Sequence, residues 1–73
     1  MNLSELGRTE IERLIDEWIV GNNAIRDREI MKARLINGIR FEPLAEQFDM
    51  SVTQIKRIVH KGTETIFKHL EVK

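Results

Sequence analysis

The 73-residue sequence contains no cysteine, and it has only one proline and four glycines. Without cysteine the chain can form neither a disulfide nor a thiolate zinc site, and this absence agrees with a reducing, cytoplasmic location. The low proline and glycine content argues against a disordered or low-complexity chain. No run of 18 apolar residues and no basic leader before an apolar segment occurs, so we expect neither a membrane span nor a secretory signal.

An excess of charge of one sign is also lacking, because 12 Lys and Arg residues balance 12 Asp and Glu residues. A net charge of zero is unusual for a protein that binds DNA unaided. Residues 1–20 carry five acids and two bases, whereas residues 52–70 carry four bases and one acid. This polarity is either ordinary surface variation or the separation of an acidic end from a DNA-facing end.

The 41% of residues that are hydrophobic suffice for one small core, so we expect a single domain over 1–73. The apolar residues recur at helical spacing, and no segment alternates for long with the period of a strand. The sequence therefore predicts an all-α fold, a compact bundle of four helices. Their expected ranges are 5–20, 24–37, 41–48 and 52–69.

Short polar motifs predict where these helices begin. Thr9 with Glu12, and again Ser51 with Gln54, have the spacing of a capping box, in which each side chain bonds the other residue's backbone N–H. Asn23 is expected to cap the second helix.

Of three further residues, two allow more than one interpretation. Gly62 falls inside the last helix, where glycine costs about 1 kcal/mol relative to alanine. It therefore indicates either a close approach of two helices or a tolerated imperfection. Trp18 lies at helical spacing and is expected in the core, whereas Phe67 falls off the apolar face and docks on another helix or on a partner.

The stretch LAEQFDMSVTQIKRIV, residues 44–59, has the pattern of a short helix, a tight turn and a second helix. Small Ala45 is expected where the two helices cross, Met50 is expected to fill the turn, and Lys56 and Arg57 project outward. The spacing predicts a helix-turn-helix over 41–60 whose second, long helix enters the major groove of DNA.

On these residues the segment from Ala24 to Leu70 resembles region 4, the C-terminal promoter-binding domain of bacterial primary-type sigma factors. DREIMKARLINGIRFEPLAEQF is similar to the helices that precede the turn, and MSVTQIKRIVHKGTETIFKHL looks like the recognition helix and its tail. The resemblance implies an N-terminal helix over 1–21 followed by a region 4-like part over 22–70. Small stand-alone proteins of this layout occur in phages and integrated elements of low-GC Gram-positive bacteria, which implies a phage-related origin.

The resemblance implies a sequence-specific transcription regulator that binds double-stranded promoter DNA, with RNA polymerase or as a homodimer. Because region 4 also binds the polymerase flap, a polymerase-binding surface is implied around the first three helices. The positions that match the family's base-reading residues are Val52, Thr53, Lys56 and Arg57. Contacts to backbone phosphates are expected at Arg40, Ser51, His60 and Lys61. The chain departs from the family at the turn, where Asp49 replaces the frequent glycine, and at Val52-Thr53, where the family usually has a charged or polar pair.

The alternative is a protein-interaction module that keeps the helix-turn-helix as a scaffold only. It would bind polymerase, a sigma factor or itself through apolar surface near Trp18, Phe41 and Phe67, and the neutral charge favours it. An enzyme is not expected, since no Gly-rich phosphate loop occurs and Asp16 and Glu17 point to different sides of a helix. No metal site, cofactor or small-molecule ligand is expected either.

Overall fold

The computed structural model describes residues 7–71, and this part of the chain forms four helices and no strand. The helices are α1 (Arg8–Trp18), α2 (Ala24–Leu35), α3 (Phe41–Gln47) and α4 (Val52–Glu71). The prediction of an all-α globule of four helices is therefore confirmed.

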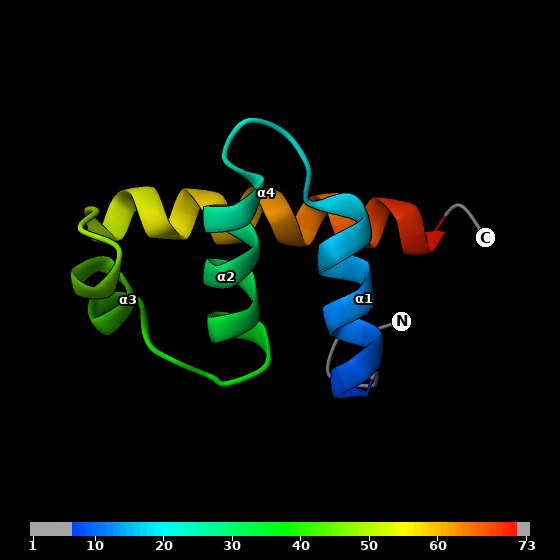
Figure 1. The fold of residues 1–73 in the computed structure, drawn as a ribbon, viewed down its shortest axis with the longest axis horizontal. Coiled ribbons are helices and arrows are strands. Elements are labelled where there is room, and N and C mark those ends of the chain that lie inside the picture. The colour runs from blue at the N-terminus through cyan, green and yellow to red at the C-terminus, as the bar shows by residue number, and fades with distance from the viewer. Residues whose placement is uncertain (1–6, 72–73) are drawn as a thin grey trace.

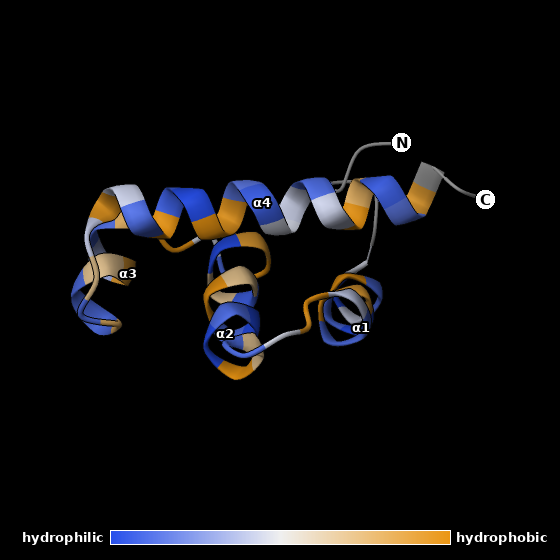
Figure 2. Cartoon of the chain, turned by 90° about the horizontal axis from the view of Figure 1, so that it is seen from above, coloured by the Kyte–Doolittle hydropathy of each residue, from blue (hydrophilic) through white to orange (hydrophobic). Residues whose placement is uncertain are grey.

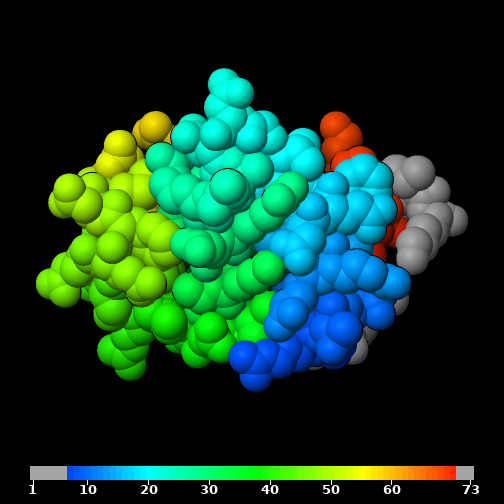
Figure 3. Space-filling view, viewed as in Figure 1, coloured from blue at the N-terminus to red at the C-terminus, as the bar shows by residue number. Residues whose placement is uncertain are grey.

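The four helices are arranged on one long member, α4. α1 and α2 run side by side across α4, and α3 packs near its first turns (Figure 1). Turned by 90°, the same three helices all lie beneath α4 (Figure 2). In the space-filling view, α1, α2 and α3 lie in front of α4 and cover most of it (Figure 3). One face of α4 is therefore buried along much of its length, and the opposite face is open.

The core fills the angle between α4 and the three helices that cross it. In α4 the buried positions are Ile55, Val59, Gly62 and Ile66, whose spacing of four and three residues is that of one helix face. Each of the other helices contributes at least one fully buried side chain to this face. The six largest fully buried side chains are Ile15, Ile30, Met31, Leu44, Ile55 and Ile66.

Gly62 marks a very close approach between α4 and α2. A Cβ atom placed on Gly62 would lie 2.6 Å from the Sδ atom and 2.8 Å from the Cε atom of Met31. Met31 is itself completely buried, so a Cβ atom on Gly62 would force the end of the Met31 side chain to shift. Of the two interpretations of this glycine, the close approach of two helices is the correct one.

The first three helices end earlier than predicted, at Trp18, Leu35 and Gln47. After Trp18 the chain turns extended at Ile19, whose carbonyl oxygen accepts a 2.7 Å hydrogen bond from the Arg28 Nε. This bond comes from the next helix, so the end of α1 is set by a tertiary contact. Residues 5 and 6, which we predicted to be helical, lie outside the described residues, and α4 continues to Glu71.

Two of the predicted caps are wrong. α1 begins at Arg8 with Gly7 as its N-cap, so Thr9 is already the second helical residue and cannot cap. Asn23 does occupy the N-cap position of α2, but its side chain makes no capping hydrogen bond.

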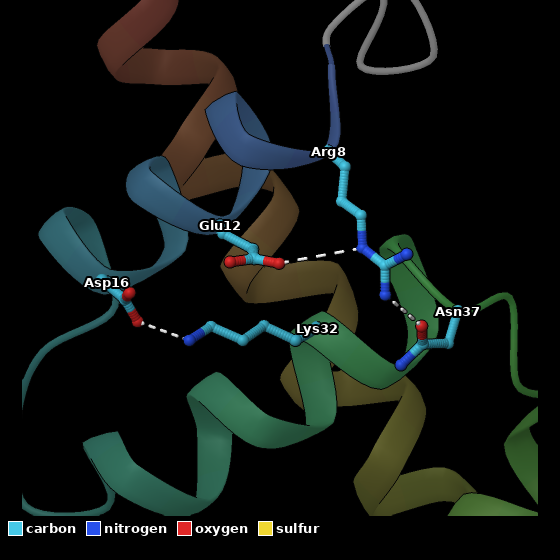
Figure 4. Close-up of polar contacts among 5 residues, drawn as sticks. All are labelled: Arg8, Glu12, Asp16, Lys32 and Asn37. Carbon is cyan, nitrogen blue, oxygen red and sulfur yellow. Dashed lines mark hydrogen bonds and ion pairs between the residues drawn. The ribbon is translucent and has the colours of Figure 1, made fainter.

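Polar contacts on the surface hold α1 against α2 (Figure 4). The Lys32 Nζ lies 2.8 Å from the Asp16 Oδ1, and the Arg8 Nη2 donates a 3.1 Å hydrogen bond to the Asn37 Oδ1. Arg8 also pairs with Glu12 at 3.8 Å. Because these groups are largely exposed, each contact contributes about 0–1 kcal/mol and serves mainly to orient the helices.

The aromatic side chains lie at the edges of the core. Trp18 is half-buried, and its ring stacks on that of His69 with the ring centroids 3.5 Å apart and the planes 10° from parallel. Trp18 thus packs at the edge of the core, beside the C-terminal end of α4, and is not fully buried within the core. Phe67 is half-buried and packs against the core. None of the described helices has the length and apolar character needed to cross a membrane.

Candidate nucleic-acid interface

The connection between α3 and α4 is closed by backbone hydrogen bonds. The Met50 N–H donates to the Ala45 carbonyl at 2.9 Å, and the Asp49 N–H donates to the Glu46 carbonyl at 3.3 Å. With Phe48 as the C-cap, this pair of bonds is the Schellman motif, which requires a left-handed residue directly after the cap. Asp49 is that residue, with a φ of 53°.

The start of α4 is fixed by the capping box at Ser51 and Gln54. The Gln54 N–H donates to the Ser51 Oγ at 3.1 Å, and the Ser51 N–H donates to the Gln54 Oε1 at 3.0 Å. This prediction is confirmed. Because the box involves only residues three apart, it forms from local sequence alone and sets the direction in which α4 leaves the turn.

We expect Asp49→Gly to raise the free energy of unfolding by about 0.5–1 kcal/mol, because glycine adopts a positive φ without the steric penalty of a Cβ atom. Asp49→Ala is the matched control and should lower it, since alanine tolerates the left-handed region less well than aspartate. Urea denaturation followed by circular dichroism measures both. Equal stability of the glycine and alanine variants would contradict a strained turn.

The open face of α4 begins at this turn. Thr53, Lys56 and Arg57 are exposed, whereas Val52 is half-buried and packs against the core. At about 100° per residue, Thr53 and Arg57 point almost directly away from the buried Ile55, and Lys56 lies on the flank toward α3. The structure thus brings three of the four predicted base-reading residues to one accessible surface and leaves the fourth, Val52, partly covered.

Lys56 is held by an aromatic ring on the neighbouring helix. Its Nζ lies over the ring of Phe41, 5.6 Å from the ring centroid. The guanidinium Cζ of Arg34 lies over the same ring at 4.4 Å. Arg34 also donates from Nη1 to the Ile39 carbonyl at 3.2 Å. Three elements, α2, α3 and α4, therefore meet at one cation–π cluster.

The four predicted phosphate-contacting residues are all exposed but are not equivalent. Arg40 is the N-cap residue of α3, close in sequence to the cation–π cluster. The Ser51 hydroxyl already accepts the capping hydrogen bond, and the His60 Nε2 lies 3.7 Å from a carboxylate oxygen of Glu64. Lys61 stays without a carboxylate partner among the described residues. Arg40 and Lys61 are thus the two whose charge is available.

The distribution of charge limits the extent of this surface. No acidic residue occurs in α4 before Glu64, and within 7–71 no ion pair involves Lys56, Arg57 or Lys61. In contrast, α3 exposes Glu42 and Glu46, which would repel phosphate groups. A polyanion therefore fits the first three turns of α4 and the N-cap residue Arg40, but not the exposed side of α3 itself, whose first turn already carries Glu42.

A hollow of about 290 Å³ adjoins this surface, and Ile19 and Val20 of the connection after α1 are among its lining residues. Met31, Ile58 and Gly62 are among its apolar residues, Arg57 and Lys61 are its cationic residues, and Asp27 is its acidic residue. Arg57 thus lines this hollow as well as the open face of α4.

Sequence reasoning missed Arg34 and the exposed apolar residues of the 19–25 segment. Val20 is 70% exposed and Ile25 is 78% exposed. Arg34 precedes Lys56 by 22 residues, and no periodic pattern links the two positions. Only the packing of α2 and α4 against α3 shows that both cations share one ring.

No protein-family model, no curated protein and no solved structure gives a significant match to this chain. The function must therefore be argued from the geometry and charge of the α3–α4 surface.

Proposed function

We propose that this protein is a small transcription regulator that binds double-stranded DNA in the major groove. α3, the 48–51 connection and the first half of α4 serve as a helix-turn-helix, and α4 is the recognition helix. The observation that carries the proposal is the open face of α4, which presents Thr53, Lys56 and Arg57 and has no carboxylate before Glu64.

The side chains of this face have donors and apolar groups suited to base edges. The guanidinium of Arg57 can donate two parallel hydrogen bonds to guanine O6 and N7, and the Thr53 methyl can pack on a thymine methyl. Val52 offers only the part of its side chain that the core leaves uncovered. Lys61 and Arg40 supply charge for phosphates on either side.

The number of available cations predicts weak binding that depends strongly on salt. Each neutralised phosphate contributes about −0.9 to the slope of log affinity against log salt. Three to five phosphate contacts therefore give low affinity that falls steeply as the salt concentration rises. A regulator of this kind therefore acts with help, as a homodimer on paired half-sites or together with RNA polymerase.

An NMR titration with a mixed-sequence duplex at low salt tests the proposal. We expect amide shifts that cluster within 51–61, because these residues line the groove, and we expect the shifts to reverse on addition of salt. Shifts confined to α1 would be inconsistent with the proposed interface.

The exposure of Val20 and Ile25 favours a second function, that of a protein-interaction module. Of the aromatic residues first considered for such a surface, Trp18 is engaged with His69 and Phe41 with Arg34. An interaction surface would therefore centre on the 19–25 segment instead. In the same titration, no response up to millimolar DNA favours this function over DNA binding.

A further inference from the structure

The cation–π cluster of Arg34, Phe41 and Lys56 places two positive charges on one ring without a carboxylate to neutralise them. The Arg34 Cζ lies 4.4 Å and the Lys56 Nζ lies 5.6 Å from the same ring centroid. Neither side chain takes part in an ion pair within the described residues. Among the described residues the Arg34 guanidinium donates one hydrogen bond, to the Ile39 carbonyl, and an arginine side chain has five N–H donors in all.

We propose that Arg34 and Lys56, both held against Phe41, form a clamp for the phosphates of the DNA backbone. The inference rests on the proposed function and changes one assignment within it. Lys56 contacts a phosphate rather than a base, Arg34 joins the interface as a residue that the sequence did not indicate, and Phe41 is a positioning residue.

The direction of the Lys56 side chain supports this assignment. Thr53 and Arg57 point away from the core, whereas the Lys56 ammonium lies over a ring of α3, at the edge of the α4 surface. In a helix that enters the major groove, the centre of the exposed face meets the base edges and its flanks meet the backbone. An ammonium is also a point charge suited to phosphate, whereas the planar guanidinium of Arg57 suits guanine.

The ring also makes the clamp ready to bind. A lysine on a bare helix surface has many conformations to lose when it contacts a phosphate, and ordering it weakens binding. A ring beneath the ammonium restricts those conformations before DNA arrives, and Arg34 is restricted further by its bond to the Ile39 carbonyl. The clamp therefore predicts that Phe41 affects DNA affinity although it carries no charge.

Fluorescence anisotropy with two labelled duplexes of unrelated sequence, at several salt concentrations, tests the clamp. We expect Arg34→Ala to weaken binding about three- to tenfold on both duplexes alike and to reduce the salt slope by about 0.9, the share of one phosphate. Lys56→Gln, at an exposed position where folding is not at risk, should behave in the same way. Arg13→Ala, which removes an exposed charge from α1 at the far end of the molecule, is the matched control and should have little effect.

Phe41 is tested by a pair of variants that keep every cation. Phe41→Leu should weaken binding about two- to tenfold, since a side chain released from the ring must be ordered again when DNA binds, and Phe41→Tyr should restore the affinity of the parent. Thermal melts of both variants separate this effect from loss of folding. A tyrosine variant as weak as the leucine variant would overturn the positioning role.

The remaining outcomes separate the clamp from the proposed function. If the parent binds neither duplex, both proposals fail. If Arg57→Ala weakens binding but Arg34→Ala and Lys56→Gln match Arg13→Ala, only the clamp fails. If Lys56→Gln changes the ratio of the affinities for the two duplexes, Lys56 reads a base and the clamp is again wrong.

Discussion

Replacing both Lys56 and Arg57 by alanine should weaken binding to duplex DNA by about 15- to 1,500-fold, enough to abolish a mobility shift at low salt. The estimate combines about 1–3 kcal/mol for a bidentate arginine–guanine contact with the three- to tenfold effect of one phosphate contact. Both side chains are exposed, and neither forms an ion pair with the described residues, so the circular dichroism spectrum should not change.

The control for this variant must remove the same charge from elsewhere. Arg13→Ala combined with Lys68→Ala also takes two exposed cations away, one from α1 and one from the last turn of α4. We expect this control to shift DNA nearly as well as the parent, because a contact with the first turns of α4 does not reach either residue. Equal binding by the Lys56/Arg57 variant and the parent would show that α4 does not enter the groove.

Gly62→Ala should lower the free energy of unfolding by up to about 2 kcal/mol, although alanine is the better helix former. The added Cβ would lie 2.6 Å from the Sδ atom of Met31, and overpacking of this kind costs about 1–3 kcal/mol. The higher helix propensity of alanine offsets about 1 kcal/mol of this cost. In a domain of this size the melting temperature should fall by up to roughly 15 °C, as scanning calorimetry can measure.

The sign of this effect should reverse when Met31 is removed. Met31→Ala alone lowers the free energy of unfolding by about 2–5 kcal/mol, because it leaves a cavity in the core. In that background the methyl group of Gly62→Ala enters the space that Met31 vacated, and the double variant should be about 1 kcal/mol more stable than Met31→Ala. If instead Gly62→Ala stabilises the parent and the Met31→Ala background equally, α2 and α4 do not meet at these two residues.

The reversal would also show why this glycine matters to the proposed interface. α4 is the element that carries the open basic face, and its buried face is seated on α2 at Gly62. A side chain at this position pushes the two helices apart. Separation at this point would also disturb the approach of Arg34 and Lys56 to the ring of Phe41, because these cations belong to the same two helices.

Features that depend on residues close in sequence could be read from the sequence. The capping box of Ser51 and Gln54 is one, since its two hydrogen bonds join residues three apart and need no other part of the molecule. The positive φ of Asp49 is another, because a turn between two amphipathic helices needs a left-handed residue. The helical periodicity likewise indicated four helices.

Another prediction from a local motif was wrong, because a different residue caps the helix. Thr9 and Glu12 have the spacing of a capping box, yet the N-cap of the helix lies two residues earlier, at Gly7. Two starts so close together differ little in local energy, so packing of the rest of the helix decides between them. The end of α1 is likewise set by contacts with the rest of the molecule, because the Arg28 side chain in α2 donates a hydrogen bond to the Ile19 carbonyl.

The sequence by itself determined that the protein is all-α, that its last helix begins at a strong cap after a tight turn, and that Thr53, Lys56 and Arg57 follow that cap. Only the tertiary structure decided that Gly62 meets Met31, that Val52 is partly covered, and that Arg34 and Lys56 share the ring of Phe41. The physical reason is one of range. Caps and periodicity arise from hydrogen bonds and apolar faces within a few residues, whereas these contacts require three helices to pack together before the side chains meet.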